Sequence, residues 1–197
     1  MAHSDTSSSS DSETSSEKVK VVGSDVYFYC EVNSESITEL ILKTKKLERT
    51  LRKRALDLPG YRPRIQLFIR SEGGDVYAGF SAYDHLRMLR VPLITISDGL
   101  CASAATFILL AGKKRLMAPH SHVLIHQISL GSFWGGNFNE LQDEMKTCKK
   151  LMQMLKDLYT ARTSLPESKL KKLMKRDIVL SVDECLRYDI VHQTFCP

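Results

Sequence analysis

The stretch Leu93–Gly112, LITISDGLCASAATFILLAG, joins an alternating apolar strand to an apolar helix through a turn of small residues. Leu93–Ser97 predicts the strand and Ser103–Ala111 predicts the helix. Ser103 is expected at the start of that helix, near unpaired backbone N–H groups and the positive end of the helix dipole. This environment suits a nucleophile, although a serine turn of this kind more often serves packing than catalysis.

Strands and helices alternate on both sides of this stretch. The expected strands are Val26–Val32, Ile65–Ile69, Leu93–Ser97, Arg115–Ala118 and His122–His126. The expected helices are Ser34–Leu58, Val76–Arg90, Ser103–Ala111, Glu140–Arg162 and one from Pro166 to Arg176, with Val182–Tyr188 closing the fold. Such alternation implies βαβ units and therefore one α/β domain.

The helix expected at Glu140–Arg162 has more apolar surface than one small domain needs. Its apolar residues follow a 4-3-4-3-4 spacing, which is the period of a stripe that packs on another helix. They are Leu141, Met145, Cys148, Met152, Leu155 and Tyr159. We therefore expect part of this helix to be buried against another subunit.

Length and composition fit one globular domain. The chain has 197 residues, of which 43% are hydrophobic and 26% charged. No apolar run reaches the roughly 18 residues needed to cross a bilayer, so the protein is expected in the cytoplasm or an equivalent organelle stroma or matrix. Five cysteines without a CxxC pair argue against a disulfide framework and a zinc site. No metal or organic cofactor is expected.

Charge is unevenly distributed along the chain. Residues 1–17 contain four acidic residues and no Lys or Arg, so this segment carries −4; because the whole chain carries +5, the remainder carries +9. Its Ser-rich composition predicts a disordered tail, with the folded domain at residues 18–197. Seven Lys and Arg residues lie between positions 43 and 54. Since no base-reading motif accompanies them, a solvated helix face or a docking surface for the chain's own acidic tail is expected rather than nucleic-acid binding.

Two further segments supply the partners that a serine nucleophile needs. In SEGG, residues 71–74, glycines after a strand expose backbone N–H groups, so Gly74 and Ala104 are candidate donors to an oxyanion. His126 is the candidate base, with His120 and His122 nearby. Asp177 is then the candidate acid that orients the imidazole. Taken singly, a glycine turn and a strand histidine have ordinary structural explanations.

Four ordered motifs resemble the ClpP caseinolytic peptidase family. They are SEGG at 71–74, GLCASAATFILLAG at 99–112, LIHQ at 124–127 and KRDIVLS at 175–181. The resemblance covers about residues 26–191, including the intervening lengths. It implies a ClpP/crotonase-like single domain of repeated ββα units with a long protruding handle helix.

The resemblance also implies a function, that of the proteolytic subunit of a chambered Clp protease. It implies a serine endopeptidase that cleaves unfolded proteins and peptides, with Ser103, His126 and Asp177 as the triad. Gly74 and Ala104 match the oxyanion donors, and the substrate strand would lie along Gly73, Asp75, Val76, Gln127 and Ile128. The implied partners are identical subunits in heptameric rings, stacked in pairs, and an AAA+ unfoldase of the ClpX, ClpA or ClpC type.

The sequence departs from the family pattern at several positions. Glu72 replaces the usual proline, Ala104 replaces a bulkier residue, and Lys175 stands where an acidic residue often pairs across the ring interface. Gln66 and Phe68 occupy the strand whose aromatic residues dock the unfoldase, and the axial-pore segment is expected to be missing. Backbone donors survive these changes, so the peptidase chemistry is expected to survive too.

Two other functions fit the sequence less well than the peptidase does. A catalytically silent ring subunit of a mixed assembly is disfavoured because such subunits have usually lost triad residues. A crotonase-like acyl-CoA enzyme shares the architecture, but such proteins are typically longer and need no Ser–His–Asp set. Covalent labelling of Ser103 by a fluorophosphonate separates the peptidase from both alternatives.

Overall fold

The computed structural model describes residues 18–129 and 137–196; the predicted tail, residues 1–17, lies outside them. Within the described residues, eight strands form one sheet and six helices pack around it. The strands are β1 (Val19–Val22), β2 (Asp25–Phe28), β3 (Ile65–Ser71), β4 (Leu93–Ala102), β5 (Lys114–Met117), β6 (His122–Leu124), β7 (Val179–Leu180) and β8 (Gln193–Thr194). The helices are α1 (Ser34–Asp57), α2 (Val76–Arg87), α3 (Ala105–Ala111), α4 (Phe138–Arg162), α5 (Glu167–Leu173) and α6 (Val182–Arg187).

The sheet is mostly parallel, in the order β1-β2-β3-β4-β5-β8, with β6 on β4 and β7 on β6. Only the β1–β2 and β6–β7 pairs are antiparallel among the described strands. β4 changes partner along its length: Ile94–Ser97 pairs with β5, whereas Leu100–Ala102 pairs with β6. This change brings the end of β4 beside β6. The mixed α/β single domain expected from the sequence is confirmed.

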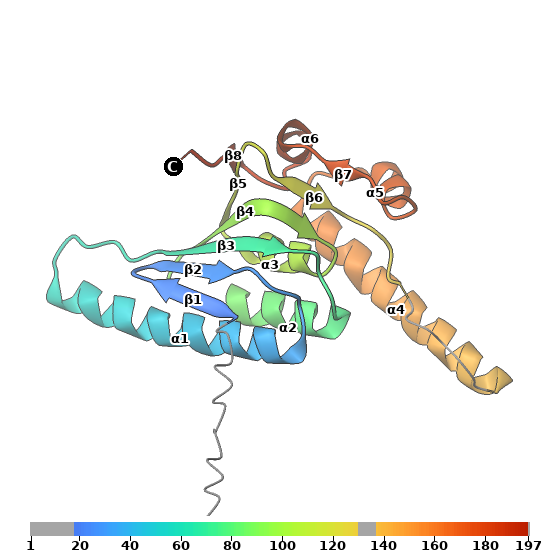
Figure 1. Ribbon diagram of the computed structural model, residues 1–197, viewed down its shortest axis with the longest axis horizontal. Coiled ribbons are helices and arrows are strands. Elements are labelled where there is room, and N and C mark those ends of the chain that lie inside the picture. Colours follow the sequence, from blue (N-terminus) through green and yellow to red (C-terminus); the bar gives the residue numbers. More distant parts are fainter. Residues whose placement is uncertain (1–17, 130–136, 197) are drawn as a thin grey trace, which may run out of the picture.

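The helices cover the sheet and enclose the core. Figure 1 shows α1 and α2 side by side along one face of the sheet. α3 contacts both α2 and β4, and all seven of its residues are buried. A helix that is buried on every side belongs in a core, so the packing of α3 fixes the helical side of the turn that precedes it.

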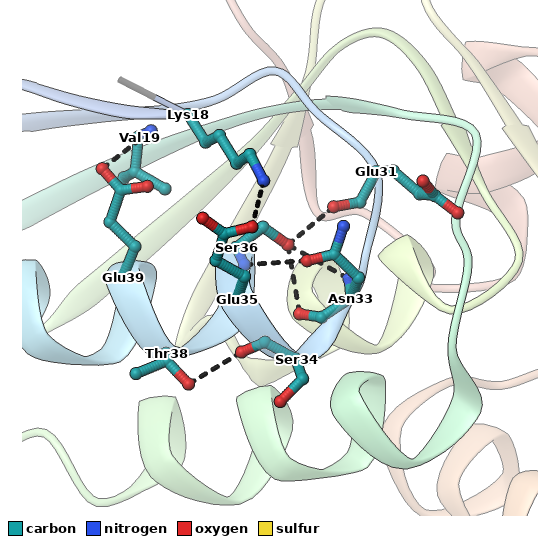
Figure 2. A network of polar contacts seen from close by, with 9 residues as sticks. All are labelled: Lys18, Val19, Glu31, Asn33, Ser34, Glu35, Ser36, Thr38 and Glu39. Atoms are coloured by element: carbon teal, nitrogen blue, oxygen red, sulfur yellow. Dashed lines mark hydrogen bonds and ion pairs between the residues drawn. The ribbon is translucent and has the colours of Figure 1, made fainter. Parts of the chain in front are cut away.

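The start of α1 is capped and tied to the first strand. The Asn33 side chain accepts a hydrogen bond from the Ser36 N–H at 2.9 Å, and Ser36 Oγ accepts one from the Asn33 N–H at 3.1 Å (Figure 2). Both interactions satisfy N–H groups that a helix leaves unpaired. The Val19 N–H of edge strand β1 donates to Glu39 Oε1 at 3.4 Å. The first strand is therefore anchored to α1 as well as to β2.

α4 is packed in its second half and exposed in its first. Leu151, Leu155, Leu158 and Tyr159 are buried, whereas Phe138, Leu141 and Met145 have 73%, 45% and 47% of their surface exposed. Figure 1 shows the first half projecting away from the sheet. Within the described residues, no helix combines the length and the apolarity needed to span a bilayer.

A buried arginine fixes the C-terminal segment. Arg115 is 3% exposed; its Nε donates to the Ile190 carbonyl and its Nη2 to the Arg162 carbonyl, each at 2.8 Å. Burial lowers the pKa of Arg115 to about 10, and burial also lowers the pKa of His192, whose Nδ1 accepts from the Arg115 N–H at 3.1 Å. The hydrogen bonds from Arg115 to Ile190 and His192 attach β8 and the segment after α6 to β5.

Several element boundaries differ from those predicted. β1 was not predicted as a strand, since three of its four residues are not buried and its pattern carries no alternation. The strand expected to reach His126 ends at Leu124. The helix expected to begin at Ser103 begins at Ala105. The last two differences both concern the candidate site.

Candidate active site

Ser103 occupies a strained turn between β4 and α3. Its φ is +53°, one of only two positive values at non-glycine residues in the described chain. Such a conformation persists only where the surroundings enforce it, and it is commonest at functional sites. The Ser103 N–H donates to the Leu124 carbonyl at 2.9 Å, and its side chain is half-buried. A sharp strand-to-helix turn of this kind presents a serine hydroxyl at the end of a sheet.

The two glycines after β3 lie against this turn. A Cβ on Gly73, whose φ is +101°, would lie 2.6 Å from Ser103 Cβ and 3.1 Å from the Ala104 nitrogen. The Gly73 carbonyl accepts from the Val32 N–H at 2.7 Å, and the Asp75 N–H donates to the Val32 carbonyl at 2.7 Å. Only a residue without a side chain permits this close approach.

Two backbone N–H groups beside Ser103 are left without partners. In the parallel bridge between Val32 and Gly74, the neighbours of Gly74 make the hydrogen bonds, so the Gly74 N–H points away from Val32. Within residues 18–129 and 137–196, neither the Gly74 nor the Ala104 N–H donates a hydrogen bond. Both residues line the same pocket as Ser103. Two such donors suit a developing oxyanion.

His126 lies two residues beyond β6 and faces the same pocket. The antiparallel pairing of β6 with β7 sets Val123 opposite Leu180 and Leu124 opposite Val179. If this register continued for two more residues, His126 would lie opposite Asp177, but among the described residues the ladder ends at Leu124 and Val179. The Gln127 N–H donates to the Met174 carbonyl at 3.0 Å, which holds the two segments together beyond the ladder.

The pocket brings together most of the predicted site residues. Its volume is about 390 Å³, and it contains Ser103, His126 and both candidate oxyanion donors. Asp177 is exposed and does not line it. In the described part of the chain, Ser103, His126 and Asp177 make no side-chain hydrogen bonds to one another. Such bonds are often long or misaligned without a substrate and tighten when it binds.

The predicted substrate contacts are mostly found at the pocket. Asp75, Val76, Gln127 and Ile128 line it, and Asp75 also caps α2 by accepting from the Ala78 N–H at 2.6 Å. Gly73 is the exception, since it packs against the nucleophile turn instead. The remaining lining residues are Glu72, Phe107, Ser129, Leu155 and Tyr159, and of these the sequence did not indicate that Phe107, Leu155 and Tyr159 belong to the site. The only signal for Leu155 and Tyr159 was the apolar stripe of the long helix.

A second nucleophilic side chain lies near the turn but is inert. Cys101 is 0% exposed, and burial raises the pKa of its thiol far above neutral pH. The thiolate is the reactive form of cysteine, so Cys101 does not compete with Ser103. Among the described residues, no cluster of three or more His, Cys, Asp or Glu side chains is placed to hold a metal ion.

The chain belongs to the Clp protease family, whose model matches residues 20–195. The ATP-dependent Clp protease proteolytic subunit of Deinococcus radiodurans is 38% identical over 140 residues, which are 70% of this chain and 68% of the relative. The chloroplastic ATP-dependent Clp protease proteolytic subunit 1 of Arabidopsis thaliana is 37% identical over 129 residues, or 64% of this chain and 65% of the relative.

The fold agrees with a solved structure of the same family. A ClpP1 mutant from Listeria monocytogenes matches with a TM-score of 0.75 and 25% identity, over 89% of this chain and 92% of that one. The resemblance read from the four motifs is therefore confirmed, as is the expected class, a Clp-type proteolytic subunit.

Proposed function

We propose that this protein is a serine endopeptidase in which Ser103, His126 and Asp177 form the triad. The observation that carries the proposal is the shared pocket: a strained serine, a histidine and two free backbone N–H groups all line it. A serine hydroxyl alone is a poor nucleophile, and this set supplies the base and the oxyanion donors it lacks.

The reaction follows from these positions. Ser103 Oγ attacks the substrate carbonyl while His126 takes the hydroxyl proton, and the oxyanion is stabilised by the N–H groups of Gly74 and Ala104. The C–N bond then breaks, and His126 returns the proton to the leaving amine. Water then attacks the acyl-enzyme carbonyl while His126 takes a proton from it, and His126 gives this proton to Ser103 Oγ as the ester C–O bond breaks. Asp177 orients the imidazole in both halves of the reaction.

The substrate is proposed to bind as an extended strand between two backbone segments. Asp75 and Val76 come from one backbone segment and Gln127 and Ile128 from another, and all four residues line the pocket. A peptide added between such segments gains main-chain hydrogen bonds that do not depend on its sequence. The inner wall, built from Phe107, Leu155 and Tyr159, favours an apolar side chain at the cleaved residue.

Assembly into paired heptameric rings is part of the proposal, with the folded unit spanning residues 18–197. The exposed first half of α4 presents Phe138, Leu141 and Met145, an apolar surface that contact with another subunit would cover. The relatives are named ATP-dependent, and an AAA+ unfoldase is the proposed partner. The cytoplasm or an organelle stroma is the proposed compartment, and the Arabidopsis relative is named chloroplastic.

Covalent labelling tests the proposal directly. A fluorophosphonate probe is expected to label the assembled wild-type protein at Ser103, and Ser103→Ala is expected to abolish both labelling and peptide turnover. Ser168→Ala, an exposed serine on α5, is the matched control and should retain both. Turnover that persists in Ser103→Ala at the same particle mass would overturn the mechanism. A correctly assembled wild type with neither labelling nor turnover would favour the silent ring subunit.

A further inference from the structure

The Ser103 carbonyl accepts two hydrogen bonds from one residue. The Thr106 N–H donates to it at 3.0 Å, and Thr106 Oγ1 donates to it at 2.6 Å. Thr106 is 1% exposed, so water does not compete for these bonds. Because a threonine hydroxyl carries a single proton, that proton is committed to the Ser103 carbonyl.

Tyr159 of α4 supplies the second partner of the same hydroxyl. Its OH lies 2.5 Å from Thr106 Oγ1. Since the Thr106 proton is already committed, Tyr159 must be the donor in this pair. Tyr159 is 1% exposed, and burial raises the pKa of its phenol well above neutral pH, so the proton stays in place. The bonds therefore run in one direction, from Tyr159 through Thr106 to the Ser103 carbonyl.

The orientation of this carbonyl decides where the Ala104 N–H points. The Ser103 C=O and the Ala104 N–H belong to one planar trans peptide, so they point in opposite directions. The two bonds from Thr106 fix the carbonyl on the α3 side, which turns the N–H toward the pocket that Ala104 lines. The peptide follows a residue with φ of +53°, a conformation that requires support.

We propose that Thr106 and Tyr159 are positioning residues that aim the Ala104 N–H at the developing oxyanion. The inference rests on the proposed function, and neither hydroxyl is assigned a contact with the reacting atoms. Arg162, also on α4, donates through Nε to the Leu110 carbonyl at 3.1 Å and through Nη2 to the Gly112 carbonyl at 3.0 Å. α4 thus holds α3 near both ends, and a displacement of α4 would be passed to the oxyanion donor.

The test compares turnover, labelling rate and stability in three variants of the assembled protein. Thr106→Val keeps the shape and removes the hydroxyl; it is expected to lower kcat and the fluorophosphonate labelling rate about tenfold, with KM within about twofold. Tyr159→Phe keeps Thr106 and should give a smaller loss. Thr106→Ser restores the hydroxyl and should recover most of the rate. A donor that acts on the oxyanion affects the transition state and not ground-state binding.

Thr44→Val is the matched control. Thr44 is also 1% exposed, its hydroxyl donates to the Leu40 carbonyl of the same helix at 2.8 Å, and it does not line the pocket. Thr44→Val should lower the unfolding midpoint as Thr106→Val does, with kcat unchanged. Wild-type kcat in Thr106→Val, or a change in KM alone, would overturn the positioning role and leave the proposed peptidase intact. If the assembled wild-type protein is not labelled by the fluorophosphonate, the proposed peptidase function is overturned, and the positioning role of Thr106 and Tyr159 is overturned with it. If Thr106→Val does not assemble, a wild-type kcat in Tyr159→Phe would overturn the positioning role of the Tyr159–Thr106 hydrogen bond.

Discussion

The substitution Gly73→Ala provides a sharp structural test of the nucleophile turn. The added Cβ would lie 2.6 Å from Ser103 Cβ, 2.8 Å from the Ala102 carbonyl oxygen and 3.1 Å from the Ala104 nitrogen. The first distance is about 0.8 Å inside the 3.4 Å at which ordinary contact begins. Neither backbone can be moved freely, because Ser103 is bonded to Leu124 and Gly73 to Val32. The nucleophile itself must shift.

Two effects then add. Alanine at a φ of +101° costs about 1–2 kcal/mol of folding free energy, as left-handed backbone does for any residue with a Cβ. A displacement of nearly 1 Å at a reacting atom costs on the order of 100-fold in rate. We therefore expect Gly73→Ala to fold with a modestly lower unfolding midpoint and to lose at least about 100-fold in kcat/KM.

Gly60→Ala separates the two effects. Gly60 has a φ of +86°, and a Cβ there meets nothing within 4 Å, so the variant carries the backbone cost alone. Both variants are assayed by urea unfolding and by hydrolysis of a fluorogenic peptide at matched particle mass. Gly60→Ala should keep wild-type turnover. The reasoning is refuted if Gly73→Ala retains it as well, or if both variants lose activity equally.

Three further predictions concern stability. Asn33→Ala removes the side chain that caps α1 through the Ser36 N–H and should lower the free energy of unfolding by about 1 kcal/mol; an unchanged urea midpoint would contradict this. Arg162→Met removes charged hydrogen bonds to two carbonyls at the end of α3 and should cost about 1.5–3 kcal/mol, whereas Arg52→Met, on an exposed stretch of α1, should cost almost nothing. The folded-state pKa of His192 is lowered by burial, so the unfolded chain binds more protons between that pKa and 6.5. Acidification through this window should therefore lower stability, and His192→Gln should make the slope shallower.

Most of the fold could be predicted from local patterns. α1 was expected at Ser34–Leu58 and ends at Asp57, because its cap and its apolar spacing are both local signals. β1 and β8 could not be predicted, since each is a short edge strand with mostly exposed residues whose pairing depends on the rest of the sheet. The switch of β4 from β5 to β6 is likewise a matter of tertiary pairing.

The candidate site, like the fold, was predicted where its signals are local and missed where they depend on tertiary packing. Ser103, His126, Gly74 and Ala104 were predicted from ordered motifs, and they line one pocket. The left-handed backbone at Ser103 was not predictable, because serine has no preference for it and neighbouring elements impose it. The contact between Thr106 and Tyr159 joins residues 53 positions apart, and it exists only because α3 and α4 pack together.

The most direct test of the triad is a structure of the assembled protein after reaction with a fluorophosphonate. We predict a covalent bond from Ser103 Oγ to phosphorus, with the phosphoryl oxygen within hydrogen-bond distance of the Gly74 and Ala104 nitrogens. The His126 ring should lie between Ser103 and the Asp177 carboxylate. An adduct on another residue, or an imidazole out of reach of both partners, would contradict the account.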